Sequence, residues 1–178
     1  WLKRIVCTSS SEIYGHYDDP ISEKFLFFPS SPYGASKAAA DRIAWSYWNT
    51  FKLPVAIIRP FNTYGPRHTY DAPPKFIQLA LEGKDITVYG DGTQTRDLTY
   101  IDDTIDGFLT IGMKEAAIGR AINIGTGKDT SILDLAKRII EVSGSSSQIV
   151  HLEPRAAEVQ RLCSDPSLAK EILTSTLI

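Results

Sequence analysis

Tyr33 and Lys37 lie four residues apart in the segment Tyr33-Gly-Ala-Ser-Lys37. In a helix this spacing places both side chains on one face, one turn apart. An ammonium group beside a phenol favours the phenolate, and a phenol tuned in this way can act as a general base toward a substrate hydroxyl. The same pattern is also typical of a surface Tyr and Lys on an amphipathic helix, so other residues must decide between the two interpretations.

A hydroxyl-rich turn, Ser9-Ser-Ser-Glu-Ile-Tyr-Gly15, precedes this pair and favours the chemical interpretation. Ser10, Ser11 and Glu12 offer hydroxyl and carboxylate groups that can move protons. Ser10 and Glu12 each have a plainer alternative, because Ser10 is also suited to cap a turn and Glu12 can be a solvated turn carboxylate.

Two strands and a helix are expected to position these residues. Residues 4–9 and 54–60 are consecutive apolar runs, as buried parallel strands require, and residues 33–51 have helical periodicity in Ala39, Ile43, Tyr47 and Phe51. A strand, a helix and a second strand of this kind form a βαβ unit.

The remaining elements alternate less regularly. Residues 18–32 and 62–74 are predicted to be loops. Further helices are expected at 74–82, 102–113, 131–142 and 166–173, and strands at 86–89, 120–124 and 148–152. The fold class is therefore α/β, a partial Rossmann-like parallel sheet with a smaller α+β substrate-binding region. The expected division is 1–65 and 66–178, with about 86–127 returning to the sheet.

Composition narrows the classes of function. The net charge of −2 gives no basic patch for nucleic acid, and no apolar run approaches the roughly 18 residues that span a bilayer. The start of the chain has no signal-peptide pattern, and Cys7 and Cys163 fit reduced thiols of a cytoplasmic protein without excluding a disulfide. His16, His68 and His151 have no metal-ligand spacing, so no metal is expected.

Five ordered motifs, which cover nearly the whole chain, resemble the nucleotide-sugar epimerase/dehydratase family of extended short-chain dehydrogenases/reductases. They are Cys7-Thr-Ser-Ser-Ser-Glu-Ile-Tyr-Gly15, Ser31-Pro-Tyr-Gly-Ala-Ser-Lys37, Arg59-Pro-Phe-Asn-Thr-Tyr-Gly-Pro-Arg67, Tyr89-Gly-Asp-Gly-Thr-Gln-Thr-Arg-Asp97 and Asn123-Ile-Gly-Thr-Gly127.

The resemblance implies NAD as cofactor and a nucleotide-diphosphate sugar as substrate. Tyr33 then removes a proton from the sugar 4-hydroxyl as C4 gives up hydride, Lys37 holds the nicotinamide ribose, and Ser10 hydrogen-bonds the same 4-oxygen. Ser9 and Pro60 match backbone positions that line the nicotinamide pocket.

The reaction subtype depends on Ser11 and Glu12. The 4,6-dehydratases and decarboxylases of the family carry a Glu at the second position, so Glu12 favours these types. In the dehydratases this Glu takes the C5 proton of the 4-keto intermediate. Ser11 departs from the Asp common in dehydratases, and residues 71–77 look more like general epimerases. A UDP-sugar 4-epimerase and a non-catalytic truncated chain remain alternatives.

For the nucleotide, the resemblance implies contacts from Asn62, Arg96 and Arg155, the two arginines clamping the pyrophosphate. Either arginine can instead form a surface ion pair with Asp97 or Glu158. The family usually has Gly where this chain has Ala157, which makes the assignment of Arg155 the weaker one.

The Gly-x-x-Gly-x-x-Gly turn that binds the cofactor pyrophosphate in this family does not occur in the chain. We therefore expect an N-terminally truncated chain that binds NAD+ poorly by itself. It should expose apolar surface on Ile5, Val6 and the Tyr33 helix and associate through it. The expected Gly-Trp and further helix after residue 173 are also missing. The full-length family member is expected to be a homodimer.

Overall fold

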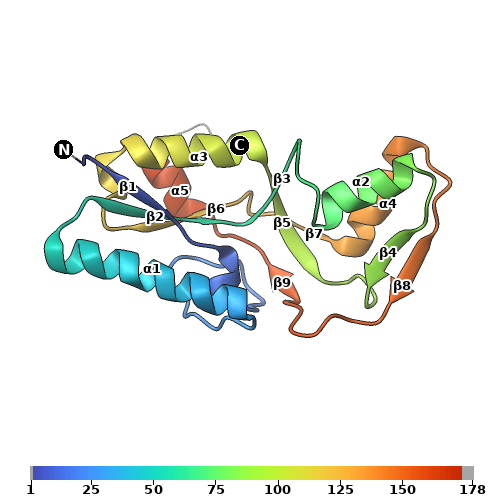
Figure 1. Cartoon of the computed structure of the whole chain (residues 1–178), viewed down its shortest axis with the longest axis horizontal. Coiled ribbons are helices and arrows are strands. Elements are labelled where there is room, and N and C mark those ends of the chain that lie inside the picture. The colour runs from blue at the N-terminus through green and yellow to red at the C-terminus, as the bar shows by residue number, and fades with distance from the viewer. Residues whose placement is uncertain (1, 174–178) are drawn as a thin grey trace.

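The computed structural model describes residues 2–173 and confirms an α/β fold with parallel strands. The first sheet has the order β1-β2-β6, all parallel, and β2 is buried along almost its whole length. One helix, α1, covers one face of this sheet, and α3 and α5 cover the other (Figure 1). The bounds are β1 (Ile5–Thr8), α1 (Pro32–Phe51), β2 (Val55–Pro60), α3 (Ile101–Met113), β6 (Ala121–Ile124) and α5 (Ser167–Leu173).

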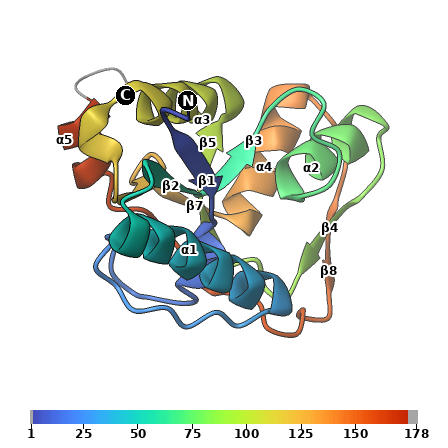
Figure 2. The same cartoon turned by 60° about the vertical axis from the view of Figure 1, so that its left-hand side comes forward.

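The second half of the chain builds two further small sheets beside the first (Figure 2). A central sheet pairs β5 with β3, β7 and β9, and an outer parallel pair, β4 with β8, packs with α2 and α4. The bounds are β3 (Asn62–Tyr64), α2 (Ala72–Leu81), β4 (Ile86–Tyr89), β5 (Thr95–Tyr100), β7 (Asp129–Ser131), α4 (Ile132–Ser143), β8 (Ile149–Leu152) and β9 (Arg161–Leu162).

The central sheet was not expected from the sequence. Residues 62–74 are not all loop, because β3 begins at Asn62 and α2 already begins at Ala72. β7 and β9 are only three and two residues long, and all of β5, β7 and β9 carry charged or hydroxyl side chains, so they lack the apolar runs that signal a strand. The buried carboxylate of Asp97 holds this sheet together, since it accepts hydrogen bonds from the backbone N–H groups of Thr126, Gly127 and Ser164.

The expectation of exposed apolar surface is right for α1 and wrong for β1. On α1, Ile43, Tyr47 and Phe51 are all exposed. Ile5 and Val6 are half-buried instead, because α3 covers β1 and Val6 packs against the core of the first sheet.

Other sequence expectations concern thiols, metals and membranes. Cys7 and Cys163 are both free, the second fully buried. Within residues 2–173 there is no group of three or more His, Cys, Asp or Glu that could bind a metal ion, and no helix with the length and apolar content of a membrane span. Residues 174–178, where the sequence departs from the expected continuation, lie outside the described part.

Candidate active site

The expected site residues follow two neighbouring parallel strands at their carboxyl ends. Ser9 follows β1, and its N–H donates to Ile58 O of β2 at 2.8 Å. Pro60 ends β2, and Asn62 comes two residues later. Ligands of open α/β sheets bind at this edge, so the topology alone brings the serine-rich turn and Asn62 to one place.

The serine-rich turn is a short 3-10 helix, Ser11–Ile13, capped by Ser10. Ser10 is buried, and its Oγ accepts a hydrogen bond from the N–H of Glu12 at 3.2 Å. The capping role considered for Ser10 is therefore present. It does not use the hydroxyl hydrogen, which stays able to donate. Ser11 is buried at the start of the turn.

The Tyr33–Lys37 pair lies at the start of α1, where this helix abuts the turn. Lys37 Nζ donates to Thr8 O, the last carbonyl of β1, at 3.1 Å, and lies 5.9 Å from the centre of the Tyr33 ring. Gly34 permits the close approach, because a Cβ there would lie 2.7 Å from the carbonyl oxygen of Glu12. Tyr33 itself is 54% exposed.

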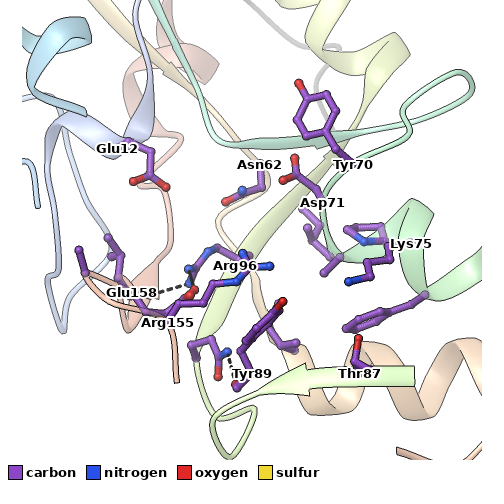
Figure 3. A pocket seen from close by; sticks show the side chains of 18 of the residues that line it. Glu12, Asn62, Tyr70, Asp71, Lys75, Thr87, Tyr89, Arg96, Arg155 and Glu158 are labelled. Carbon is purple, nitrogen blue, oxygen red and sulfur yellow. Dashed lines mark hydrogen bonds and ion pairs between the residues drawn. The ribbon is translucent and has the colours of Figure 1, made fainter. Parts of the chain in front are cut away.

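A cavity of about 570 Å³ lies between the turn, β3, β5, α2, β4 and the segment before β9. Figure 3 shows Glu12 at one side of the pocket, Asn62 near its centre, and Arg96 and Arg155 below them. Four of the predicted residues thus share one pocket. Its lining does not include Tyr33 and Lys37 of α1, Pro60 at the end of β2, or the serines Ser9, Ser10 and Ser11.

Glu12 is a partly buried carboxylate rather than a solvated one. Burial raises the pKa of Glu12; Arg96 lowers it, and the carboxylates Glu158 and Asp71 raise it again. A carboxylate whose proton affinity is increased by burial is a better base than a free one, and remains able to hand the proton on.

Arg96 is paired within the chain, as one alternative anticipated, but not at the surface. Its Nη2 donates to Glu158 Oε1 at 2.5 Å, and Nη1 donates to Val159 O and Thr95 O, each at 2.8 Å. Its side chain is only 12% exposed. Asp97, the other anticipated partner, instead accepts hydrogen bonds from Thr126 and Gly127 in the turn after β6.

Arg155 belongs to residues 153–160, which we call the strap and which are exposed except for the buried Val159. Its guanidinium lies 4.0 Å from the centre of the Tyr89 ring, a cation–π contact. Ala157 in the strap has φ of 58°, in the left-handed region that favours glycine, and its carbonyl accepts a hydrogen bond from Ser30 Oγ at 3.3 Å. The family glycine at this position therefore has a conformational reason.

A buried network that the sequence analysis missed lies behind the turn. Arg59 donates to both carboxylate oxygens of Asp41 at 2.8 and 3.0 Å and to the Tyr14 hydroxyl at 2.7 Å; this hydroxyl donates to Asn123 Oδ1 at 2.8 Å. Arg59 and Asp41 are fully buried. Asp41 lies one helical turn after Lys37, a signal that the sequence contained.

The Tyr33–Lys37 arrangement also fits the nicotinamide ribose of NAD. An ammonium group has three donors, and Lys37 uses one on Thr8 O, so two remain for ribose hydroxyls. The half-exposed Tyr33 beside it keeps its hydroxyl accessible to a substrate.

Comparison with known proteins shows which family the chain belongs to. The model of the NAD dependent epimerase/dehydratase family matches residues 2–125. The chain belongs to this family. Among family relatives, the low-salt glycan biosynthesis protein Agl12 of Haloferax volcanii is 38% identical over 174 residues, 96% of this chain and 56% of that protein. The dTDP-D-glucose 4,6-dehydratase of Dictyostelium discoideum is 39% identical over 155 residues, 80% of this chain and 36% of that protein.

Solved family structures match almost the whole chain. UDP-glucuronic acid 4-epimerase from Bacillus cereus, in complex with UDP-glucuronic acid and NAD, gives a TM-score of 0.92 at 37% identity, over 99% of this chain and 58% of that one. dTDP-glucose 4,6-dehydratase from Bacillus anthracis, in complex with NAD, gives 0.91 at 29% identity, over 97% and 56%. The chain thus spans just over half the length of Agl12 and of both structures.

Proposed function

We propose that this chain forms the substrate-binding and proton-transfer part of an NAD-dependent enzyme that modifies a nucleotide-diphosphate sugar through a 4-keto intermediate. One observation carries the proposal: a proton-accepting carboxylate, Glu12, shares a pocket with Arg96 and Arg155, which suit a diphosphate. Asn62 adds support, because its Oδ1 is buried at this pocket without a hydrogen-bond partner, as expected of a group that awaits a ligand donor.

Each residue has a role in this proposal. Bound NAD supplies the acceptor for the hydride that leaves C4. Tyr33 takes the proton of the sugar 4-hydroxyl while Ser10 donates to the same oxygen, and Lys37 stabilises the phenolate. The carbonyl then present at C4 acidifies the C5–H bond, and Glu12 accepts that proton. Arg96, Arg155 and Asn62 hold the nucleotide diphosphate.

The reaction subtype follows from what Glu12 does. A 4,6-dehydratase or decarboxylase uses a 4-keto group to labilise a neighbouring bond, and in the dehydratase Glu12 exchanges the C5 proton with solvent. A UDP-sugar 4-epimerase breaks no bond at C5. The similarity to the Bacillus cereus 4-epimerase favours a UDP-sugar 4-epimerase as the second candidate. Incorporation of solvent deuterium at C5 of the product separates the two.

The binding part of the proposal is tested by calorimetric titration of this chain with UDP, dTDP and NAD+ separately. We expect UDP or dTDP to bind, and Asn62→Ala to weaken that binding about tenfold by removing one hydrogen bond to the ligand. Asn49→Ala, an exposed amide on the far end of α1, is the matched control and should change nothing. Absence of binding by both nucleotides would overturn the proposal. We expect NAD+ to bind weakly in all variants.

A further inference from the structure

Three basic side chains line the pocket, and they differ in how they are neutralised. Arg96 forms an ion pair with Glu158. Arg155 and Lys75 have no carboxylate within ion-pair distance among residues 2–173. Glu12 and Asp71 also line the pocket, but neither pairs directly with Arg155 or Lys75, so both cations are able to contact an anionic ligand.

These two cations meet at one aromatic ring. Arg155 contacts Tyr89 at 4.0 Å, and Lys75 Nζ lies 6.0 Å from the centre of the same ring. Figure 3 shows Arg155 reaching Tyr89 from the strap and Lys75 reaching it from α2. Two cations at one ring, with which no carboxylate of residues 2–173 pairs directly, attract an anionic group of a ligand.

An internal partner for Lys75 stands nearby but is used elsewhere. Asp71 lies four residues before Lys75, the spacing at which a helix commonly forms an ion pair. Its Oδ2 instead lies 3.1 Å from His68 Nε2, and no ion pair joins it to Lys75. The ammonium of Lys75 is thus turned toward Tyr89 and the pocket.

The position of Lys75 indicates which part of a ligand it meets. Glu12 occupies one end of the pocket and Lys75 and Thr87 lie at the other, with Tyr89 between them (Figure 3). A ligand whose sugar lies at Glu12 places its nucleoside at this far end. Resting on the proposed function, we propose that Lys75 is a further substrate-binding residue that contacts the phosphate nearest the nucleoside, opposite Arg155 across Tyr89.

The test is calorimetric titration of Lys75→Met with UDP, UMP and uridine. We expect about tenfold weaker binding of UDP and of UMP, since both contain the phosphate that Lys75 contacts, and unchanged binding of uridine. The loss should shrink at high salt, because added ions screen an exposed charge. Lys84→Met is the matched control: it makes the same charge change at an exposed lysine paired with Glu82, and should bind all three ligands as the unmodified chain does.

The possible outcomes distinguish failure of the Lys75 role from failure of the proposed function. Equal affinity of Lys75→Met and the unmodified chain for UDP and UMP overturns the role of Lys75 and leaves the proposed function intact. An equal loss for uridine overturns it too, because Lys75 would then act on the nucleoside. If the unmodified chain binds neither UDP nor dTDP, the proposed function itself fails. Matching thermal unfolding of the two variants confirms that both are folded.

Discussion

The turn that carries Glu12 and the strap that carries Arg155 face the same pocket but are fixed in different ways. Behind the turn lies the fully buried network of Arg59, Asp41 and Tyr14. The strap is exposed apart from Val159, and it is held by the packing of that side chain, the Arg96–Glu158 pair and a hydrogen bond from Ser30. Proton transfer tolerates little displacement, whereas a ligand must enter and leave, so the rigid wall fits the chemistry and the exposed wall fits binding.

The largest loss of stability should come from disrupting the buried network behind the turn. Asp41→Ala leaves the Arg59 guanidinium buried without its counterion, so we expect the free energy of unfolding to fall by about 3–5 kcal/mol. Asp18→Ala, at an almost fully exposed aspartate, should change it by less than about 0.5 kcal/mol. Urea unfolding of both variants measures the difference, and comparable stabilities would contradict a buried, paired network.

A smaller effect is expected where α1 meets the turn. Gly34→Ala places a Cβ against the backbone oxygen of Glu12, which cannot rotate away, and should destabilise the chain by about 1–3 kcal/mol. Gly112→Ala, also within a helix, meets only a side-chain carbon of Val6 at 3.7 Å and should stabilise by about 0.5–1 kcal/mol. Thermal unfolding that moves both variants in the same direction would disprove the close contact.

The ion pair between Arg161, just after the strap, and Asp129 should stabilise the fold less at acid pH. Arg161 Nε donates to Asp129 Oδ2 at 2.8 Å, and this hydrogen bond contributes most to lowering the pKa of Asp129 from 3.8 to about 2. A lowered pKa stabilises the fold above the unfolded value and loses that contribution as pH falls through the folded one. The stability advantage over Asp129→Asn should therefore be constant above about pH 5 and shrink between about pH 4 and 2. Unfolding free energies measured across this range decide it, and an advantage independent of pH would rule out the ionised pair.

The smallest effect is expected in the strap itself. Ala157→Gly relieves the left-handed backbone at φ 58° but gives the unfolded chain more freedom, so the net gain should be about 0.5 kcal/mol. Ala156→Gly, at the neighbouring position, has no positive φ to relieve and should be neutral or slightly destabilising. Unfolding curves for the two variants measure the contrast, and a loss of stability in Ala157→Gly would contradict the strained conformation.

The sequence predicts the first sheet well because β1 and β2 are apolar runs and the chain between them includes a long stretch without helix breakers. The apolar residues that indicated α1, Ile43, Tyr47 and Phe51, are exposed rather than buried against the sheet. It misses the central sheet because β5 gains its stability from Asp97 and from long-range partners, which no local pattern reveals. Glu12, Asn62, Arg96 and Arg155 are found by motif, and they do share a pocket. The pairing of Arg96 with Glu158, 62 residues away, and the contact of Lys75 with Tyr89 depend on tertiary structure alone.

The most direct test of a shared proton-transfer and nucleotide pocket is an NMR titration of the Glu12 side-chain carboxyl with and without bound UDP. Burial should place the pKa of Glu12 above 4.5 in the free chain. UDP should raise it further, because the diphosphate brings negative charge to the pocket and competes for Arg96. A pKa at or below 4.5 that does not respond to bound UDP would contradict the account, since Glu12 would then be neither buried nor near the nucleotide.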